Sequence, residues 1–579
     1  MKMHNNDVAE LFDRLADLLE IEGANPFRVR AYRNAARLIR SLPREVADMV
    51  AAGEDLTRLP GIGEDLAGKI KTIVETGTLP LLEEEARKVP PELAELLEIE
   101  GLGPKRVKVL HEVLGVRSLE DLERAVNAGK VRELPGFGEK TERAILEGIQ
   151  RLRAQYGRTL LATAEPVAEA LREHLAATTG VERVEIAGSY RRRKETVGDL
   201  DILAIAAPDS PVMDRFTTFE AVARVHSKGT TRSTVHLRSG LQVDLRVVAP
   251  QSYGAALQYF TGSKAHNIAV RRLAVKRGLK INEYGIFRGS RRIGGAEEEE
   301  VYASVDLPWI PPELREDRGE IEAAMAGRLP ELITQDHIRG DLHVHSKHTD
   351  GRYSIEDMAL AARELGYEYI AVTDHSRRVT MAHGLDEKRL RQELEEIDRL
   401  NERLEGIRIL KGCEVDILED GRLDLPDSVL AELDLTVCSV HYRFNLPREK
   451  QTTRILRAMD NPYFTILGHP TGRLINERDP YDVDLDRIIR HAAERGAILE
   501  LNAQPSRLDL TDTACQQAKE LGVKIAISTD AHTVHDLRFM RYGIGQARRG
   551  WLEAGDVVNT LPLPDLLDLL ARTRHARAA

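Results

Sequence analysis

Hydrophobic and polar positions follow three successive patterns along this chain of 579 residues. Residues 1–155 place apolar side chains every three or four positions between short polar loops, which is typical of amphipathic helices. From about 160 to 250 helical segments alternate with short apolar runs typical of strands, and from Ile338 onward such runs alternate with amphipathic helices. The patterns predict a multidomain α/β protein with a helical N-terminal region, a mixed-sheet domain and a C-terminal parallel barrel.

Changes between these patterns mark the expected domain boundaries. A helical stretch with aromatic and basic residues follows the mixed domain, then a turn-rich segment, and residues 313–335 show the pattern of a charged connecting helix. The resulting division has six parts: helical domains at 1–80 and 81–155, a mixed domain at 156–250, a small subdomain at 251–315, a linker at 316–336 and the barrel at 337–579.

A glycine motif occurs three times in the helical region. LPGIG begins at Leu59, IEGLG at Ile99 and LPGFG at Leu134, and each is followed by a helical pattern with a lysine nearby. Such glycines allow a tight turn and the close approach of a phosphate, whose oxygens the free N–H groups of the next helix receive. One copy could be a simple turn, but three indicate helix-hairpin-helix units that bind a nucleic-acid backbone without reading sequence. The predicted contacts are Gly61, Gly63, Gly101, Gly103, Gly136 and Gly138.

Three carboxylates of the mixed domain predict a divalent-metal site. Asp199 and Asp201 are one residue apart in a strand-like run, so both point to the same face. Asp244 lies in a later strand and would join them if the two strands pair side by side. Converging carboxylates suit Mg²⁺, and two such ions can activate a hydroxyl nucleophile and stabilise a leaving pyrophosphate. An Asp-x-Asp pair alone also occurs on plain solvated strands.

A phosphate cradle is predicted just before these carboxylates. Gly188 and Ser189 offer a permissive backbone and a hydroxyl, and Arg191, Arg192 and Arg193 follow them. The basic run could also be only a solvated surface.

Nine side chains of metal-ligand type come directly after apolar runs in the C-terminal region. They recur at the same end of successive predicted strands, where a β/α barrel gathers ligands at one mouth. Mixed imidazole and carboxylate ligands suit Mn²⁺, Zn²⁺ or Fe²⁺ better than Ca²⁺. The sequence therefore predicts a multinuclear metal site with hydrolytic chemistry, whose ligands are His343, His345, Asp350, His375, Glu414, His441, His469, Asp530 and His532.

Composition and charge narrow the class of protein. The net charge of −11 argues against a uniformly basic coat, although basic patches occur within 191–194, 224–238 and 271–280. None of the three cysteines lies in a CxxC pair, which argues against a disulfide framework or a thiolate zinc site. With no apolar run near the roughly 20 residues of a membrane span and no signal-peptide core, we expect a cytoplasmic protein that does not contact membranes. No coiled-coil or patch signal indicates an obligate assembly, so we expect a monomer.

The order of the motifs in the mixed domain resembles the nucleotidyltransferase core of the family X DNA polymerases. GS, then DLD, then a later Asp strand are followed by YFTGS from Tyr259. The resemblance implies a palm with a mixed sheet and a small thumb, with Asp199 and Asp201 binding both Mg²⁺ or Mn²⁺ ions. Asp244 would be the third ligand and accept the proton of the primer 3′-hydroxyl. Nucleotide contacts would come from Gly188, Ser189, Arg192, Gly198, Tyr259, Phe260 and Gly262, and minor-groove contacts at the nascent pair from Asn267 and Arg271.

One position departs from this pattern. Some relatives carry a phosphate-binding hydroxyl where this chain has Val197, so one phosphate contact is expected to be missing.

The N-terminus resembles the small lyase-type domain of the same family, in which a lysine attacks an abasic sugar as a Schiff base. NPFRVRAYRNAARLI precedes the first glycine motif, and Lys69 matches the position of the nucleophile, with Tyr32 and Arg28 near it. Asp65 stands where eukaryotic relatives place a basic residue, and Gly68 replaces an acidic neighbour. Contact with a backbone phosphate is therefore the favoured role of Lys69, with the lyase role as the alternative.

The C-terminal motifs DLHVHSKHTDG, TDH, a lone glutamate, VHY, GHP and TDAH resemble the PHP phosphoesterase domain. The resemblance implies a distorted seven-stranded β/α barrel holding up to three Mn²⁺, Zn²⁺ or Fe²⁺ ions, and the nine predicted ligands match its positions one for one. It also implies a metal-dependent 3′-5′ exonuclease, with cleavage at abasic sites or removal of 3′-phosphates as further activities.

Taken over nearly its whole length, the chain resembles the bacterial family X DNA polymerases with a C-terminal PHP domain. The leading hypothesis is a DNA repair enzyme that fills short gaps in gapped or nicked duplex with dNTPs, as in base excision repair, and trims 3′ ends at a second centre. One alternative is a nucleotidyltransferase acting on RNA or a small acceptor, coupled to a small-molecule phosphatase. The other is a non-catalytic scaffold for DNA ends.

Overall fold

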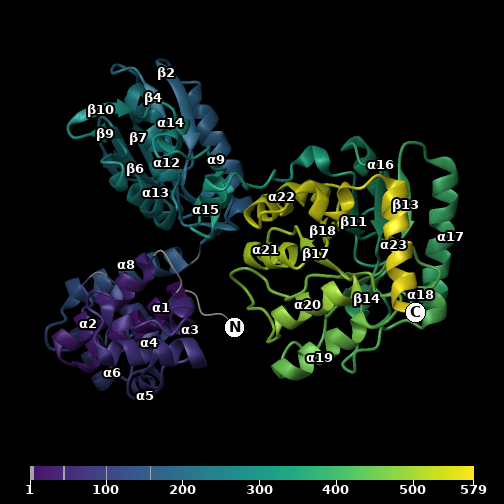
Figure 1. The fold of residues 1–579 in the computed structure, drawn as a ribbon, viewed down its shortest axis with the longest axis horizontal. Helices are drawn as coiled ribbons and strands as arrows, with labels where there is room; N and C mark the ends of the chain where they lie inside the picture. The colour runs from purple at the N-terminus through teal and green to yellow at the C-terminus, as the bar shows by residue number, and fades with distance from the viewer. Residues whose placement is uncertain (1–4, 43–45, 100, 157, 579) are drawn as a thin grey trace. The chain divides into compact units, whose positions relative to one another are not determined.

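The computed structural model describes residues 5–42, 46–99, 101–156 and 158–578. It divides into two compact units, Met1–Gly157 and Arg158–Ala579 (Figure 1). Among the described residues, the helices are too short or too polar to span a lipid bilayer.

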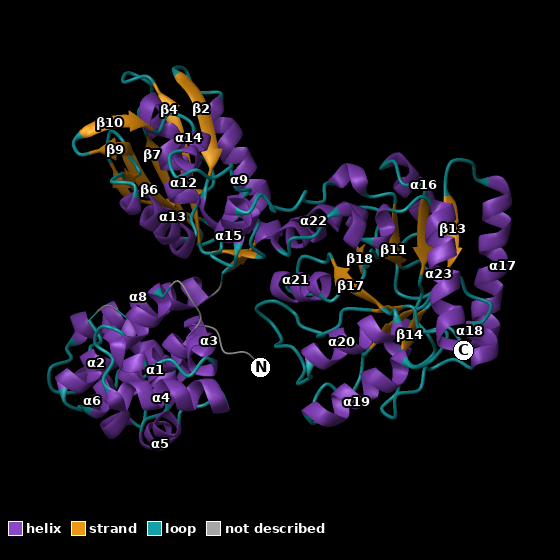
Figure 2. Cartoon of the chain, viewed as in Figure 1, coloured by secondary structure: helices purple, strands orange, loops and turns teal. Residues whose placement is uncertain are grey.

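In the described part of the N-terminal unit, helices joined by short loops are the regular secondary structure (Figure 2). They pack around two apolar cores, and α1 (Asn5–Glu22) serves both, because Leu15 faces the core that contains Phe12 and Leu18 faces the core that contains Val107. The remaining helices are α2 (Pro26–Ser41), α3 (Val46–Ala51), α4 (Glu64–Thr76), α5 (Pro80–Lys88), α6 (Pro104–Leu114), α7 (Leu119–Asn127) and α8 (Glu139–Tyr156), with 3₁₀ turns η1 (Leu56–Arg58) and η2 (Pro91–Glu98).

A mixed five-stranded sheet begins the second unit. Its order is β2-β4-β7-β6-β5, in which β4 and β7 run parallel and the other pairs are antiparallel. The strands are β2 (Val181–Ile186), β4 (Asp199–Ala206), β5 (Val222–Lys228), β6 (Arg232–Leu237) and β7 (Gln242–Val247); α9 (Leu161–Ala176), α10 (Gly188–Arg191), α11 (Val212–Thr217) and the small pair β1 (Thr159–Leu160) and β3 (Thr196–Val197) accompany them. This is the predicted mixed sheet.

A smaller subdomain follows the sheet. It consists of α12 (Tyr253–Thr261), α13 (Lys264–Lys276), β8 (Lys280–Asn282), β9 (Gly285–Arg288), β10 (Arg291–Gly294), α14 (Glu298–Ala303), η4 (Pro312–Leu314) and α15 (Glu320–Met325). The charged helix predicted over 313–335 is wrong in length, since only α15 forms there. Gly319 and Gly327, both with positive φ, bracket that helix, and Ile321 packs into the core of the subdomain instead of facing solvent.

The C-terminal region is the predicted barrel. Its parallel strands form two sheets, β11-β12-β13 and β14-β15-β16-β17-β18, joined by bridges from His375 to Glu414 and from Val344 to Ala531. Because β13 and β14 are separated by only two residues and continue one another, the barrel has seven strands. These are β11 (Gly340–Val344), β12 (Tyr369–Val372), β13 (Arg408–Lys411) with β14 (Glu414–Asp416), β15 (Val437–Ser439), β16 (Ile466–Leu467), β17 (Ile498–Asn502) and β18 (Ile525–Ser528).

Helices surround the strands, as Figure 2 shows. Most of their apolar faces pack with the strands into one large core, which includes Met358, Ile397 and Ile489. Leu566 and Leu570 of the last helix pack into a separate core with strand residues such as Tyr369. The helices are α16 (Ile355–Glu364), α17 (Glu387–Arg403), α18 (Asp427–Leu430), α19 (Arg448–Met459), α20 (Leu485–Arg495), α21 (Asp512–Glu520), α22 (Met540–Arg549) and α23 (Leu563–Ala578).

Within the second unit, the barrel and the mixed sheet share part of a core. Leu508 and Tyr542 of the barrel region belong to the apolar cluster that fills the space between the sheet and α9. The Tyr542 hydroxyl donates to Glu165 Oε2 at 2.7 Å, and Arg473 forms an ion pair with Glu195.

Candidate active sites and nucleic-acid contacts

Strand register brings the three carboxylates of the mixed sheet together. Asp201 on β4 is the direct neighbour of Asp244 on the parallel strand β7, and Asp199 lies two residues before Asp201 on the same face. Gly188 precedes them as the first residue of α10, with φ of +63°, and a Cβ there would lie 3.0 Å from Asp201 Oδ2. The glycine therefore lets the backbone approach the carboxylates closely.

The charges of this triad are unfavourable without a cation. Burial, followed by repulsion from Asp199 and Asp244, raises the pKa of Asp201 to about 7. Burial also raises the pKa of Asp244, but hydrogen bonds donated by Thr234 and Gln242 and the Arg232 charge outweigh it and lower that pKa overall. Adjacent carboxylates that repel one another when both are ionised need a cation between them. They form a set of oxygen donors that fits Mg²⁺ or Mn²⁺.

The arginines of the predicted phosphate cradle are paired within the protein, and the cradle itself stays a prediction. Each arginine of the run is already paired with a glutamate: Arg191 with Glu298 at 2.7 Å, Arg192 with Glu316 at 3.0 Å and Arg193 with Glu165 at 2.8 Å. The run therefore joins elements within the protein in this structure. A triphosphate would have to replace Glu316 as the partner of Arg192.

Glu298 is the most enclosed of these glutamates, with 4% of its surface exposed, and it also binds Arg315. Although burial raises its pKa, Arg315 and Arg191 lower it to about 2, below the ordinary value of 4.5. Ionised Glu298 thus stabilises the fold above pH 4.5, and this stabilisation is lost as the pH falls towards 2. We expect Glu298→Gln to lower the free energy of unfolding by about 3 kcal/mol at pH 7, because it leaves buried guanidinium groups unpaired.

Urea unfolding at pH 7 and at about pH 3 measures this effect. The difference between the variant and the unchanged protein should shrink at the lower pH. The neighbouring exposed Glu299, changed to glutamine, is the matched control. A difference independent of pH would contradict the assigned role.

The other predicted nucleotide contacts are placed as follows. Tyr259 and Phe260 end α12 with their rings 5.0 Å apart, and Arg271 lies 5.2 Å above the Tyr259 ring. Asn267 is 6% exposed, donates to the Tyr259 carbonyl at 2.7 Å and accepts from Gln258 at 2.8 Å, and its minor-groove role stays a prediction. Its amide holds the junction between α12 and α13 and is not available to a minor groove in this structure.

Four further positions of the predicted nucleotide site remain. Ser189 is half-buried in α10, next to the carboxylates. Gly198 and Gly262 face arginines, since a Cβ would lie 3.2 Å from Arg158 and 3.1 Å from Arg192 respectively. Val197 is fully buried in the apolar core, so it makes no phosphate contact.

The three glycine motifs adopt the same local geometry. The first glycine of each has positive φ, between +81° and +87°, and the second directly precedes a helix: α4, α6 or α8. The residue between the glycines is buried in each copy (Ile62, Leu102 and Phe137), while the six glycines themselves are exposed. An apolar anchor thus holds each turn with its backbone facing outward, as a phosphate contact requires.

Lys69 on α4 forms an ion pair with Asp65, one turn earlier. Its ammonium lies 5.8 Å from the centre of the buried Tyr32 ring, and Arg28 is exposed on α2. Contact with a backbone phosphate and attack on an abasic sugar both stay predictions for Lys69.

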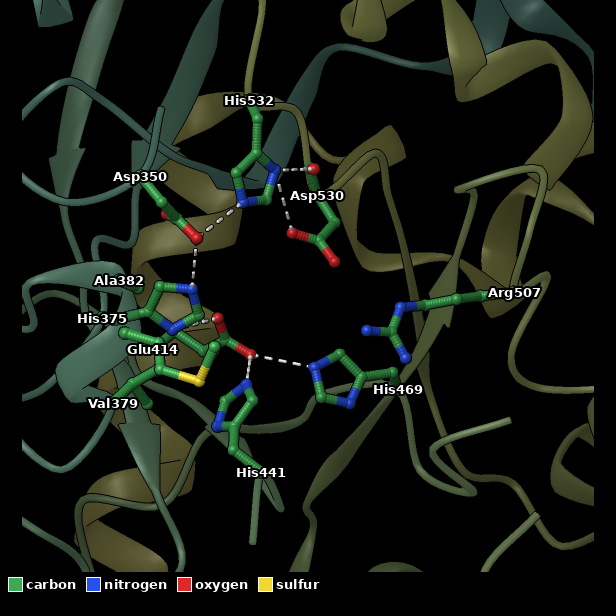
Figure 3. A pocket seen from close by; sticks show the side chains of 11 residues that line it. Asp350, His375, Val379, Ala382, Glu414, His441, His469, Arg507, Asp530 and His532 are labelled. Atoms are coloured by element: carbon green, nitrogen blue, oxygen red, sulfur yellow. Dashed lines mark hydrogen bonds and ion pairs between the residues drawn. The ribbon is translucent and has the colours of Figure 1, made fainter. Parts of the chain in front are cut away.

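The nine predicted barrel ligands gather at one mouth, and seven of them line a cavity of about 300 Å³ (Figure 3). Glu414 at the start of β14 is the central residue. Its carboxylate oxygens lie 3.0 Å from His375 Nδ1, 3.2 Å from His441 Nε2 and 3.0 Å from His469 Nε2. The other two ligands, His343 on β11 and His345 just beyond it, are fully buried, and their Nε2 atoms each lie 3.4 Å from Glu414 Oε2.

Eight of the nine ligands, all except His469, fall into three overlapping groups, in each of which one donor atom per residue lies within 4.8 Å of the others. They are His345 with Asp350, His375 and His532; His343 with His345 and Asp530; and His375 with Glu414 and His441. Among the described residues, the buried atoms His345 Nδ1 and His469 Nδ1 have no hydrogen-bond partner. Unsatisfied buried imidazole nitrogens beside carboxylates fit bound metal ions.

Charges in the cluster are strongly coupled. Burial lowers the pKa of His343, but Glu500, Asp530 and Glu414 outweigh it and raise that pKa well above its usual value. Burial raises the pKa of Glu414, but His375, His441 and His343 hold it well below its usual value. Without metal ions, protons on the imidazoles therefore balance the carboxylates, and metal binding would release them.

A second layer of carboxylates orients the ligands, and the sequence analysis missed it. Glu500 on β17 accepts from the backbone N–H of His469 and lies 2.6 Å from His343 Nδ1, and Asp416 on β14 lies 3.2 Å from His441 Nδ1. Such partners fix the ring and tautomer of a metal-binding histidine. Asp416 could have been found, since it follows Glu414 by two residues in a strand and shares its face.

A carboxylate triad on a mixed sheet and a polynuclear ligand set in a β/α barrel define a metal-dependent phosphoryl-transfer enzyme with two separate centres. Family models match in the same order: a helix-hairpin-helix domain at 3–79, a SAM-like helix-hairpin-helix tandem at 93–151, the DNA polymerase beta thumb at 256–316 and the PHP domain at 341–504. DNA polymerase/3′-5′ exonuclease PolX from Bacillus subtilis (strain 168) is 39% identical over 574 residues, covering 98% of this chain and 100% of that protein. The chain belongs to the bacterial family X DNA polymerases with a C-terminal PHP domain.

Two further relatives cover single regions. A probable phosphatase from Thermoanaerobacter sp. (strain X514) is 32% identical over 231 residues, which are 38% of this chain and 89% of that protein. DNA polymerase lambda of Arabidopsis thaliana is 28% identical over 347 residues, which are 54% of this chain and 62% of that protein. Their names agree with a polymerase and a phosphoesterase joined in one chain.

Proposed function

We propose that this chain fills short gaps in DNA at the Asp199, Asp201 and Asp244 site and trims 3′ ends as a 3′-5′ exonuclease at the nine barrel ligands. Membership of the family makes it a DNA polymerase and 3′-5′ exonuclease. The assignment of each activity to its residues is the proposal. It rests above all on the joint presence, in one chain, of the paired strands β4 and β7 and the three ligand groups.

In the polymerase reaction the primer 3′ oxygen bonds to the α-phosphorus of a dNTP, and the bond to the leaving pyrophosphate breaks. Asp199, Asp201 and Asp244 would hold Mg²⁺ or Mn²⁺ there. When bound, these ions would offset the charge of the triphosphate and favour ionisation of the primer hydroxyl. Asp244, whose pKa is already low, would be a weak proton acceptor, and the proton could pass through it to solvent.

In the exonuclease reaction the oxygen of a water molecule bonds to the phosphorus of the last phosphodiester. The bond from that phosphorus to the 3′ oxygen of the preceding nucleotide breaks, and a nucleoside 5′-monophosphate leaves. The barrel ligands would hold up to three Mn²⁺, Zn²⁺ or Fe²⁺ ions, which when bound would activate the water and neutralise the phosphate. Abasic-site cleavage and 3′-phosphate removal use the same bond chemistry.

The three glycine motifs would hold the duplex by its backbone, with Lys69 as one phosphate contact. Gapped or nicked duplex and dNTPs are the proposed substrates, and we expect the chain to act as a monomer in the cytoplasm. The alternative of an RNA or small-acceptor nucleotidyltransferase is not favoured, because a small substrate needs no repeated backbone contact.

A time course on a duplex with a one-nucleotide gap tests the function. With dNTPs and Mn²⁺ the primer should lengthen by one nucleotide, and with Mn²⁺ alone it should shorten from its 3′ end. Chelation of metal should stop both reactions, and NTPs should replace dNTPs poorly. Extension of an RNA or small acceptor in preference to the gapped duplex would contradict the proposal.

A further inference from the structure

The barrel cavity has two walls that the metal ligands do not explain. On one side it is lined by Val379, Met381 and Ala382, from the loop after β12. Arg507, from the loop after β17, reaches into the cavity from the side facing Val379 and Ala382 (Figure 3). Neither wall contributes to the three ligand groups.

Met381 is unusually exposed for an apolar side chain. It is 90% exposed, more than the other large hydrophobic residues in the described part of the chain, whereas the adjacent Val379 is 8% exposed. The loop that carries it is braced, because Leu385 N–H donates to the His375 carbonyl at 2.7 Å and Arg378 N–H donates to Asp424 at 2.7 Å. A firmly held loop that presents a methionine beside a hydrolytic centre offers a flat apolar ligand a contact surface.

Arg507 is a cation that lacks an anionic partner. In the part of the chain that the structure describes, its guanidinium makes no hydrogen bond or ion pair, although it is half-buried. A second cation, Arg478, lies near Arg507. Burial and the positive charge of Arg507 both lower the pKa of Arg478. The loop is fixed by the N–H of Asn502, which donates to the Asp509 carbonyl at 2.6 Å. An arginine held towards a cavity without a partner suits a phosphate, which it can bind through two parallel hydrogen bonds.

We infer that Val379, Met381 and Arg507 form a subsite for the 3′-terminal nucleotide of a single DNA strand, with the base against the methionine wall and the phosphate at Arg507. This inference rests on the proposed exonuclease function and adds to it a preference for ends that carry a base. A cavity of about 300 Å³ is at the small end of ligand sites, which suits one nucleotide better than a base pair.

Two oligonucleotides test the subsite. One single strand ends in an ordinary nucleotide, and the other ends in an abasic tetrahydrofuran analogue with the same phosphodiester. The unchanged protein should release the ordinary nucleotide with the higher kcat/KM in Mn²⁺. Met381→Ser should reduce this ratio of kcat/KM values about tenfold, mainly through KM, because contact of a base with a side chain contributes to binding but not to the bond broken.

Arg507→Gln should lower kcat/KM for both oligonucleotides about tenfold or more, and Arg507→Lys should recover part of the loss. Met325→Ser on α15, where the methionine is 52% exposed away from the cavity lining, is the matched control and should leave the ratio unchanged. Metal content and thermal unfolding should be the same for all variants, since the altered side chains are outside the ligand groups.

The outcomes separate the subsite from the exonuclease function. If the unchanged protein trims neither strand, the proposed exonuclease function fails. If it trims both but Met381→Ser affects them equally or not at all, the base contact is wrong while the exonuclease stands. Full activity of Arg507→Gln on both strands would exclude the phosphate contact.

Discussion

Asp199→Asn combined with Asp201→Asn should abolish gap filling, by about 10³-fold or more, while 3′ trimming in Mn²⁺ stays within about twofold. Metal ions at such a site supply several kcal/mol of stabilisation to the transition state, and each 1.4 kcal/mol is a factor of about ten in rate. Asparagine keeps the size of the side chain and removes the charge. Single-turnover incorporation on a gapped duplex, followed beside degradation of a single strand, measures both activities.

The thermal stability of the Asp199 and Asp201 variants gives a second test of the metal site. Since repulsion from Asp199 and Asp244 contributes to the raised pKa of Asp201, the amide variants should unfold at an equal or higher temperature than the unchanged protein when metal is absent. Asp209→Asn, in an exposed turn beyond β4, is the matched control and should change neither activity. Loss of trimming in the folded double variant would contradict the model of two separate centres.

Glu414→Gln should produce the opposite pattern, with trimming lowered by about 10³-fold or more and gap filling within about twofold. Glu414 contacts five imidazoles, so its neutralisation removes the negative charge that these five side chains face in common. The barrel should then lose bound metal, which mass spectrometry of the purified protein can count. Thermal unfolding should also occur at a lower temperature, because buried charged histidines lose their partner.

Two further variants make this result interpretable. His441→Gln alters a ligand that is only partly enclosed, with 17% of its side chain exposed, and should lower metal content and trimming without a large loss of stability. Glu419→Gln, at an exposed position in the loop after β14, should have no effect. A Glu414→Gln protein that keeps both its metal and its exonuclease activity would show that the cluster is not the second centre.

The features that the sequence predicted best were those set by local spacing. The barrel ligands follow strand ends, so the parallel topology alone brings them to one mouth. Likewise, alternation along a strand fixes the shared face of Asp199 and Asp201, and the only longer-range condition was that β7 pairs beside β4. The glycine motifs depend on a turn of five residues, and all three copies have the predicted form.

Features that depend on distant partners could not be read from the sequence. The glutamates that bind Arg191 and Arg192 lie 107 and 124 positions further along the chain, so the sequence could not show that these arginines are paired within the protein. The buried position of Asn267 follows from how α12 and α13 meet, and Glu500 faces His343 only after β17 and β11 enter the same barrel. No local pattern carries this information.

Deleting the barrel would be a poor way to measure the polymerase activity separately from the exonuclease activity. Leu508 and Tyr542 complete the apolar filling behind the mixed sheet, and the Tyr542 hydroxyl donates to Glu165 on α9. A shortened chain ending before residue 337 would expose apolar surface and remove the Tyr542 hydrogen bond to Glu165, although Arg193 would still pair with that carboxylate. A fall in synthesis by such a chain could therefore come from damaged packing. Single-residue substitutions therefore separate the polymerase activity from the exonuclease activity more reliably than truncation does.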